Sequence, residues 1–304
     1  MIEQTDFPLL VEQAMSLPGR ANMRPVIEKE LLHYDILFTL DRKGLLDKLT
    51  FQGGTSLRLC YGASRFSEDL DFAGGKNFAS TILKDMKDCI EHYIGKRYDL
   101  EVSVKEPNEL REEPEYAELK VDKWRISVVT TPGRKSLPKQ RIKIEVANIP
   151  AYSRQPLALQ QNYDFLPDGY SDTLIMTETL DEIMADKLMS LVNCQRYVRY
   201  RDIWDLRWLK QQGAEIKIEW IQGKIRDYQI ENYVKKLDEM LSRLPEIIIG
   251  KDFKEEIKRF IPMDVQERTL LKGKFYDFLS HEIRGLLSDV RVQLIGGADD
   301  EFRM

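Results

Sequence analysis

Residues 51–59 of the chain read FQGGTSLRL, and residues 65–72 read RFSEDLDF. The first stretch is typical of a short strand that runs into a glycine pair and then into a helix. The second alternates charged and apolar side chains from Asp69 to Phe72, as a half-buried strand does. A strand, a glycine turn, a helix and a second strand are therefore expected to form the structural centre of this part of the chain.

The glycine turn has the composition of a phosphate-binding loop. Gly53 and Gly54 allow the backbone to approach a phosphate closely, and the helix that follows offers free N–H groups at its N-terminus. Thr55 and Ser56 add hydroxyl donors at the same place. Because the same four residues also suit an ordinary turn and helix cap, the turn alone is a weak indication of nucleotide binding.

Two aspartates on the second strand strengthen the case. Asp69 and Asp71 are two residues apart, so in a strand their side chains point to the same face. Leu70 and Phe72 then point to the opposite, buried face. Two neighbouring carboxylates repel each other unless a cation lies between them, and magnesium prefers carboxylate and phosphate oxygens. The pair predicts a metal site, although a solvated acidic strand would show the same pattern.

A third carboxylate is expected from a predicted β-hairpin. Residues 124–128 and 141–146 alternate as strands do, with a long turn-prone loop between them. Glu145 lies on the polar face of the second of these strands. If that strand neighbours the strand of the two aspartates, Glu145 could complete the metal site or act as a general base. The alternative, weighted equally, is an exposed glutamate beside Lys143 and Arg141.

A lysine is predicted to lie inside the apolar seam of a later helix. The sequence TLDE at residues 179–182 resembles a capping box that opens a helix reaching to about Arg196. Lys187 then falls on the same stripe as Leu180 and Leu191. A buried ammonium needs a partner, and either a bound triphosphate or a carboxylate from the first domain would supply it. A lysine that extends its stem to solvent is the alternative.

Two segments are basic. Residues 196–208 interleave four arginines with aromatic side chains, which suits a phosphate backbone and stacked bases. Asp202 and Asp205 share one helix face there. The second segment, between the two strands of the hairpin, is basic and turn-prone. The candidate nucleic-acid contacts from these two segments are Arg134, Lys135, Arg199 and Arg201, against the plain alternative of solvated loops and surface ion pairs.

Composition limits the remaining classes. The 304 residues carry a net charge of −5, so any contact with nucleic acid must come from local basic patches. Three widely separated cysteines form no disulfide framework, and three histidines form no zinc-ligand spacing. No signal peptide and no run of about 20 apolar residues is seen, which predicts a cytoplasmic protein.

The pattern of elements predicts an α+β fold with two domains. Helical spacing predicts helices over residues 25–43 and 78–97, and the strands described above form a mixed sheet. After Pro150 the sequence becomes mostly helical and charge-rich. The predicted domains are residues 1–160, carrying the catalytic groups, and residues 161–304, mostly helical and completing the active site.

Residues 51–72 resemble the first motif of the AbiEii/AbiGii nucleotidyltransferase toxins, which belong to the polymerase-beta-like nucleotidyltransferase superfamily and have the MenT toxins as relatives. The resemblance extends to Asp186-Lys187-Leu188 and to residues 201–206, RDIWDL. It implies a nucleotidyltransferase-like mixed sheet with flanking helices, followed by a helical lobe. It also implies that Ser56 and Lys187 bind the nucleotide, that Asp69 and Asp71 bind metal, and that Asp202 or Asp205 is the active-site aspartate.

The resemblance also implies an activity. A nucleoside triphosphate and Mg²⁺ would be bound, and nucleotides would be transferred to the 3′ acceptor end of tRNA with release of pyrophosphate. The chain would be the toxin of a bacterial toxin–antitoxin or abortive-infection system, with a cognate antitoxin as partner. The alternatives are transfer to a protein or small molecule, and a non-catalytic module that only binds nucleotide.

Overall fold

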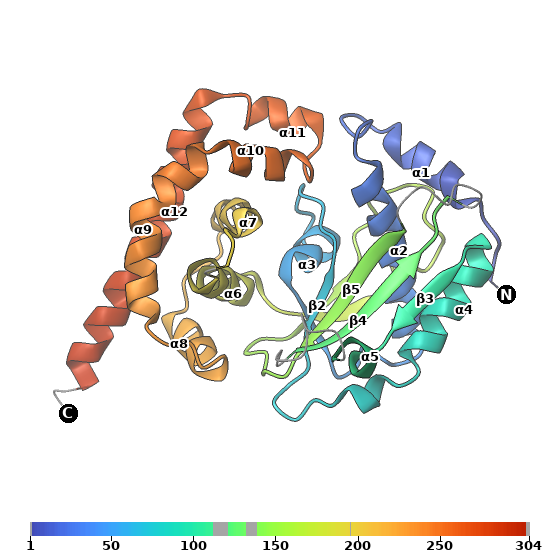
Figure 1. Ribbon diagram of the computed structural model, residues 1–304, viewed down its shortest axis with the longest axis horizontal. Helices are drawn as coiled ribbons and strands as arrows, with labels where there is room; N and C mark the ends of the chain where they lie inside the picture. Colours follow the sequence, from blue (N-terminus) through green and yellow to red (C-terminus); the bar gives the residue numbers. More distant parts are fainter. Residues whose placement is uncertain (1, 112–120, 132–138, 195, 302–304) are drawn as a thin grey trace. The chain divides into compact units, whose positions relative to one another are not determined.

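The computed structural model describes residues 2–111, 121–131, 139–194 and 196–301. The chain divides into two compact units, Met1–Glu178 and Thr179–Met304. The first unit runs from blue to green-yellow in Figure 1 and the second from yellow to red. Each unit has its own core.

The first unit contains a seven-stranded mixed sheet with helices beside it. The strand order across the sheet is β3-β4-β5-β2-β1-β7-β6. The strands are β1 (Thr50–Gln52), β2 (Leu70–Ala73), β3 (Val102–Lys105), β4 (Val121–Val128), β5 (Gln140–Ala147), β6 (Gln155–Ala158) and β7 (Leu174–Thr177). The helices are α1 (Phe7–Met15), α2 (Arg24–Asp41), α3 (Gly53–Cys60), α4 (Met86–Tyr98) and α5 (Pro107–Arg111), with a 3₁₀ turn at Ser80–Leu83.

The strands pair as the alternating sequence requires. β4 and β5 are antiparallel neighbours, which confirms the predicted hairpin. β5 then pairs in parallel with β2, and β2 pairs antiparallel with β1. Residues that alternate along these strands form one buried apolar face, with Leu70, Phe72, Trp124, Ile126, Ile142, Ile144 and Val146 each at most 1% exposed. The opposite face of the same strands carries most of their charged side chains, while Asp122 lies on the buried face at 3% exposed.

Helices α2 and α4 pack with the sheet and with each other (Figure 1). α2 contacts β5, and α4 contacts β3. The predicted helix over residues 25–43 is confirmed, since α2 spans Arg24–Asp41. The helix predicted over residues 78–97 is shorter than expected, because α4 begins only at Met86. The fold of this unit is α+β, as the sequence predicts.

The described residues of the second unit form an assembly of helices around an apolar core. Its helices are α6 (Leu180–Asn193), α7 (Tyr200–Gln211), α8 (Ile218–Asp227), α9 (Tyr233–Ile249), α10 (Lys251–Lys258), α11 (Met263–Arg268) and α12 (Gly273–Glu301). α6 packs on α7, α8 and α9, while α9 packs along α12. The Thr179 hydroxyl accepts a hydrogen bond from the Glu182 amide at 3.4 Å, so the predicted N-terminal cap of α6 is present.

The two units meet in sequence after Glu178. The expected boundary after residue 160 falls inside the first unit, because β7 lies in residues 161–178 and pairs with β1. Within the part of the chain that is described, no helix has the length and apolar character needed to cross a bilayer.

Candidate active site

The glycine turn joins β1 directly to α3, and Gly53 is the first residue of that helix. Gly53 has a φ of +78°, in the left-handed region that favours glycine. A Cβ atom at this position would lie 2.7 Å from Oδ2 of Asp71. Gly53 is therefore required for two reasons: its backbone conformation, and the close approach of the Asp71 carboxylate to the turn.

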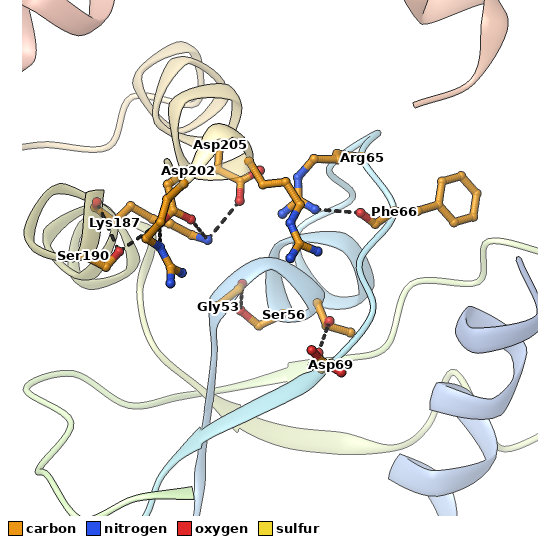
Figure 2. Close-up of polar contacts among 12 residues, drawn as sticks. Gly53, Ser56, Arg65, Phe66, Asp69, Lys187, Ser190, Asp202 and Asp205 are labelled. Atoms are coloured by element: carbon orange, nitrogen blue, oxygen red, sulfur yellow. Dashed lines mark hydrogen bonds and ion pairs between the residues drawn. The ribbon is translucent and has the colours of Figure 1, made fainter. Parts of the chain in front are cut away.

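The second glycine makes room for an arginine. A Cβ atom on Gly54 would overlap the guanidinium of Arg65 and would lie 3.0 Å from the Ser67 hydroxyl. Arg65 is 3% exposed and donates a hydrogen bond to the Phe66 carbonyl at 2.7 Å (Figure 2). Arg65 was not predicted as a site residue. The signal for it in the sequence is its place in the RFSEDLDF motif, four residues before Asp69.

Both hydroxyls of the turn make contacts within the first unit. The Ser56 hydroxyl donates to the Gly53 carbonyl at 2.9 Å, and the side chain is fully buried (Figure 2). The Thr55 hydroxyl donates to the Asp69 carbonyl. Thr55 thus ties the start of α3 to the residue that precedes β2, and Ser56 closes the first turn of α3.

Two of the predicted metal-binding carboxylates, Asp71 and Glu145, lie in adjacent strands of one sheet, and the third, Asp69, directly precedes β2. Asp71 and Glu145 are register partners on the parallel strands β2 and β5. Partners in register point to the same face, and Asp69 is two residues before Asp71, so Asp69 belongs to that face as well. The backbone amide of Lys143 donates to Oδ1 of Asp69 at 3.0 Å. The condition set for Glu145, a strand next to that of the aspartates, is met.

The electrostatics of this group suit a cation. Burial raises the pKa of Asp69 above its ordinary value, and the charge of Glu145 raises it further, while the amide and ammonium of Lys143 act in the opposite direction. Lys123 forms an ion pair with Glu145 at 2.7 Å. Carboxylate oxygens are the ligands that Mg²⁺ prefers, so the chemistry of these three side chains fits a magnesium site. Their ligand oxygens do not all lie within 4.8 Å of one another.

Helix α2 supports the segment that leads into the aspartates. Lys29 forms an ion pair with Glu68 at 2.7 Å, and Nε2 of His33, one helical turn later, lies 3.0 Å from the Glu68 carbonyl oxygen. Burial lowers the pKa of His33 to about 4, so the ring is neutral at pH 7 and donates this hydrogen bond. Neither contact was expected from the sequence.

The second unit places Lys187 inside its core, as the apolar stripe predicted. Lys187 is 7% exposed, and its Nζ lies 2.7 Å from Oδ1 of Asp202 and 3.0 Å from Oδ2 of Asp205 (Figure 2). The partner expected from the sequence was either a bound triphosphate or a carboxylate from the first domain. Both partners come instead from α7 of the same unit, one turn apart on one face.

Asp202 has further partners besides Lys187. Its Oδ2 accepts from the Ser190 hydroxyl at 2.9 Å and is paired with Arg199. Burial alone would raise the pKa of Asp202, but the charges of Lys187 and Arg199 outweigh burial and hold the pKa well below its ordinary range. Asp202 is therefore ionised and fixes the end of the Lys187 side chain.

A second buried lysine braces α6 and was missed by sequence reasoning. Lys224 on α8 is fully buried, and its Nζ lies 2.9 Å from Glu182 and 2.7 Å from Asp186. Both acidic residues are on α6, one turn apart, and Asp186 directly precedes Lys187. The signal in the sequence was weak, because Lys224 looks like one of many charged residues on an amphipathic helix.

The predicted nucleic-acid contacts have different outcomes. Arg134 and Lys135 lie outside the described residues. Arg199 pairs with Asp202, as described above. Arg201 lies 3.7 Å from Glu256 and stacks over the ring of Phe260 at 4.8 Å. Arg199 and Arg201 both have partners inside the second unit. Their contact with nucleic acid stays a prediction.

Comparison with known proteins gives the class. Residues 35–281 match the sequence model described as "Nucleotidyl transferase AbiEii toxin, Type IV TA system". The chain is therefore a nucleotidyltransferase by class. It belongs to the AbiEii nucleotidyltransferase toxin family of toxin–antitoxin systems.

Solved structures that are similar to the chain have low sequence identity to it. The nucleotidyltransferase toxin MenT4 from Mycobacterium tuberculosis is 18% identical, with a TM-score of 0.52, over 95% of this chain and 99% of that one. JHP933 from Helicobacter pylori is 17% identical, with a TM-score of 0.41, over 91% and 97% of the two chains. The MenT4 likeness supports the fold. No curated protein sequence matches the chain.

Proposed function

We propose that the chain transfers nucleotides from a nucleoside triphosphate to the 3′ acceptor end of tRNA, with release of pyrophosphate. The observation that carries the proposal is the register of Asp71 with Glu145, together with the close approach of the Asp71 carboxylate to Gly53 of the glycine turn. A phosphate-binding turn beside clustered carboxylates suits a reaction at a phosphorus atom.

The reaction forms one bond and breaks one. The oxygen of the RNA 3′ hydroxyl attacks the α-phosphorus, and the bond from that phosphorus to the oxygen bridging to the β-phosphate breaks. Pyrophosphate leaves, and the hydroxyl proton passes to a base or to solvent. Asp69, Asp71 and Glu145 would hold Mg²⁺, which when bound offsets the negative charge of the triphosphate and the attacking oxygen.

The remaining site residues have roles that follow from their charge and position. Gly53, Gly54 and Ser56 would lie against the phosphates, with the N–H groups at the start of α3 as donors. The buried guanidinium of Arg65, beside Gly54, adds a cation to the same turn. Lys187 would bind the triphosphate, with its Nζ positioned by Asp202 and Asp205.

The family supports the wider role. Membership in a toxin family of toxin–antitoxin systems favours a cognate antitoxin as partner. Nucleotide transfer to tRNA ends would then arrest growth by blocking aminoacylation. Expression of the wild-type chain should stop growth, while expression of Asp71→Ala should not.

The direct test is a transfer assay. The purified chain is incubated with Mg²⁺, total tRNA and each of the four labelled nucleoside triphosphates in turn. Label should appear on tRNA with the wild type and be absent with Asp69→Ala. Label on protein in place of RNA would reject a tRNA acceptor, and equal labelling of tRNA by both proteins would reject the role given to Asp69.

A further inference from the structure

The second unit contains a hollow of about 220 Å³ that has no part in the chemistry described above. It lies between the segment that follows α6 and one face of α9. Its walls are Cys194, Arg196, Tyr197, Val198, Lys236, Glu239, Met240 and Arg243. Four of these residues belong to α9. Glu239, Met240 and Arg243 lie three, four and seven residues after Lys236, so the four form a single stripe of that helix.

The hollow is positively charged. Arg196, Lys236 and Arg243 face one carboxylate, that of Glu239. Lys236 is oriented by donating a hydrogen bond to Oδ1 of Asn193 at 2.9 Å. Across the described residues, no carboxylate forms an ion pair with Arg196 or Arg243. In a chain of net charge −5, such a concentration of positive charge favours an anionic ligand.

An aromatic side chain, that of Tyr197, also lines the hollow. Tyr197 is 63% exposed, although a tyrosine normally buries much of its ring. Met240, at 7% exposed, supplies an apolar surface inside the hollow. A flat exposed ring beside two arginines is the combination that binds a nucleobase by stacking and its phosphate by charge.

We propose that this hollow binds one nucleotide unit of the RNA acceptor, with the base stacked on Tyr197 and the phosphate held by Arg196 and Arg243. The proposal rests on the proposed function, which supplies RNA as the acceptor. The hollow is smaller than the roughly 300–1,000 Å³ of sites that enclose a whole small molecule. It suits one unit of a strand that continues along the surface.

The proposal also explains which of the basic residues in the segment after α6 are available. Arg199 and Arg201 are engaged with Asp202 and with Glu256 inside the unit. Arg196, three residues earlier, is exposed and faces Arg243, which no sequence pattern links to it. RNA contact is thereby assigned to Arg196, Tyr197 and Arg243.

The test measures binding of a fluorescent single-stranded RNA of about 12 nucleotides, within the usual range of site sizes. Anisotropy is followed for the full chain over a series of salt concentrations, without nucleotide or magnesium. The double variant Arg196→Ala/Arg243→Ala should bind at least tenfold more weakly. Its slope of log K against log salt should fall by about 0.7, the value for one lost phosphate contact on a single strand.

Tyrosine variants separate stacking from charge. Tyr197→Ala should bind about tenfold more weakly with an unchanged salt slope, and Tyr197→Phe should bind like the wild type. The matched control is Arg226→Ala/Arg284→Ala, which removes two exposed arginines from α8 and α12 of the same unit. The control should keep the wild-type affinity and slope.

The outcomes separate this site from the proposed function. Equal RNA affinity of the pocket variants and the control, or no RNA binding by the wild type, overturns the site. If the pocket variants lose RNA binding while the wild type transfers no label to RNA, the site stands and the proposed function fails. If transfer occurs and the KM for RNA is the same in the pocket variants, the function stands and the site fails.

Discussion

Asp71 and Glu145 are direct register partners on the adjacent parallel strands β2 and β5. They lie 74 positions apart in the sequence but on one face of the sheet. Lys123 on β4 is in turn the register partner of Glu145 and pairs with it at 2.7 Å. One row across three strands thus reads carboxylate, carboxylate, ammonium.

The first prediction concerns Glu145→Gln. Amide replacement keeps the shape of the side chain but removes one carboxylate from the proposed magnesium site, so nucleotide transfer should fall by about 100-fold or more. The free energy of unfolding without magnesium should change by less than about 1 kcal/mol, because the pair with Lys123 keeps contact with solvent, at 15% and 26% exposed, and contributes little. Chemical denaturation and the transfer assay measure the two effects.

The control for this variant is Glu101→Gln. Glu101 also forms an ion pair with a lysine at 2.7 Å, that of Lys139, but it is far more exposed and is not on β2 or β5. Glu101→Gln should leave nucleotide transfer unchanged. Full activity of Glu145→Gln would show that Asp69 and Asp71 suffice without a third carboxylate.

The second prediction compares two glycines that flank α3. Gly53 and Gly62 have φ values of +78° and +75°, so alanine at either position is strained by about 1–2 kcal/mol. A Cβ atom on Gly62 meets nothing within 4 Å, whereas one on Gly53 meets the Asp71 carboxylate. Gly53→Ala should therefore lose activity as well as stability, while Gly62→Ala should lose stability alone. Equal activity in the two variants would contradict the role given to Gly53.

The sequence predicts those site features that depend on local pattern. Alternation places Asp69 and Asp71 on one face and also reveals the hairpin that carries Glu145. Helical spacing places Lys187 in a buried stripe. Each of these inferences needs only the number of residues after which side chains point the same way again, which is 2 in a strand and 3.6 in a helix.

Features that depend on tertiary contacts could not be predicted in the same way. The stripe on α6 shows that Lys187 is buried, but not that α7 packs there and supplies both carboxylates. The Phe78 ring packs tightly against Gly74, where a Cβ atom would lie 2.6 Å from it, and a 3₁₀ turn at Ser80–Leu83 comes before α4 begins at Met86. Arg243 and Arg196 line the same hollow only because of the way α9 packs.

The third prediction concerns pH and His33. The pKa of His33 lies at about 4 in the folded chain and at 6.5 ordinarily, mainly because burial disfavours the charged ring. The stability that this group contributes is present above pH 6.5 and is lost as the pH falls through 6.5 towards 4. The loss for a shift of this size is about 3 kcal/mol. His33→Gln should remove this part of the pH dependence.

Chemical denaturation between pH 4 and pH 7 measures the effect. The glutamine amide can still donate to the Glu68 carbonyl, and every other titrating group is common to both proteins, so their difference isolates His33. The control is His281→Gln, at an exposed position on α12, which should follow the wild type. Parallel curves for wild type and His33→Gln would contradict the prediction.

The fourth prediction concerns the group formed by Lys187, Asp202 and Asp205. Lys187→Met leaves two buried carboxylates without their shared ammonium, so the free energy of unfolding should fall by about 3–5 kcal/mol. Asp202→Asn should cost less, because Lys187 keeps Asp205 at 3.0 Å. Lys210→Met is the control: Lys210 is exposed and pairs with Glu282 at 3.0 Å, so its loss should cost less than about 1 kcal/mol.

The pH dependence of Asp202→Asn gives an independent check on the same group. Because the folded pKa of Asp202 is depressed, the stability it contributes is present above its ordinary pKa of 3.8 and is lost as the pH falls through the lowered folded value. The gap between wild type and Asp202→Asn should therefore be constant from pH 7 to about pH 5 and narrow below pH 4. A gap that stays constant in acid would mean that Asp202 acts through shape and hydrogen bonding, and that its charge does not hold Lys187 in place.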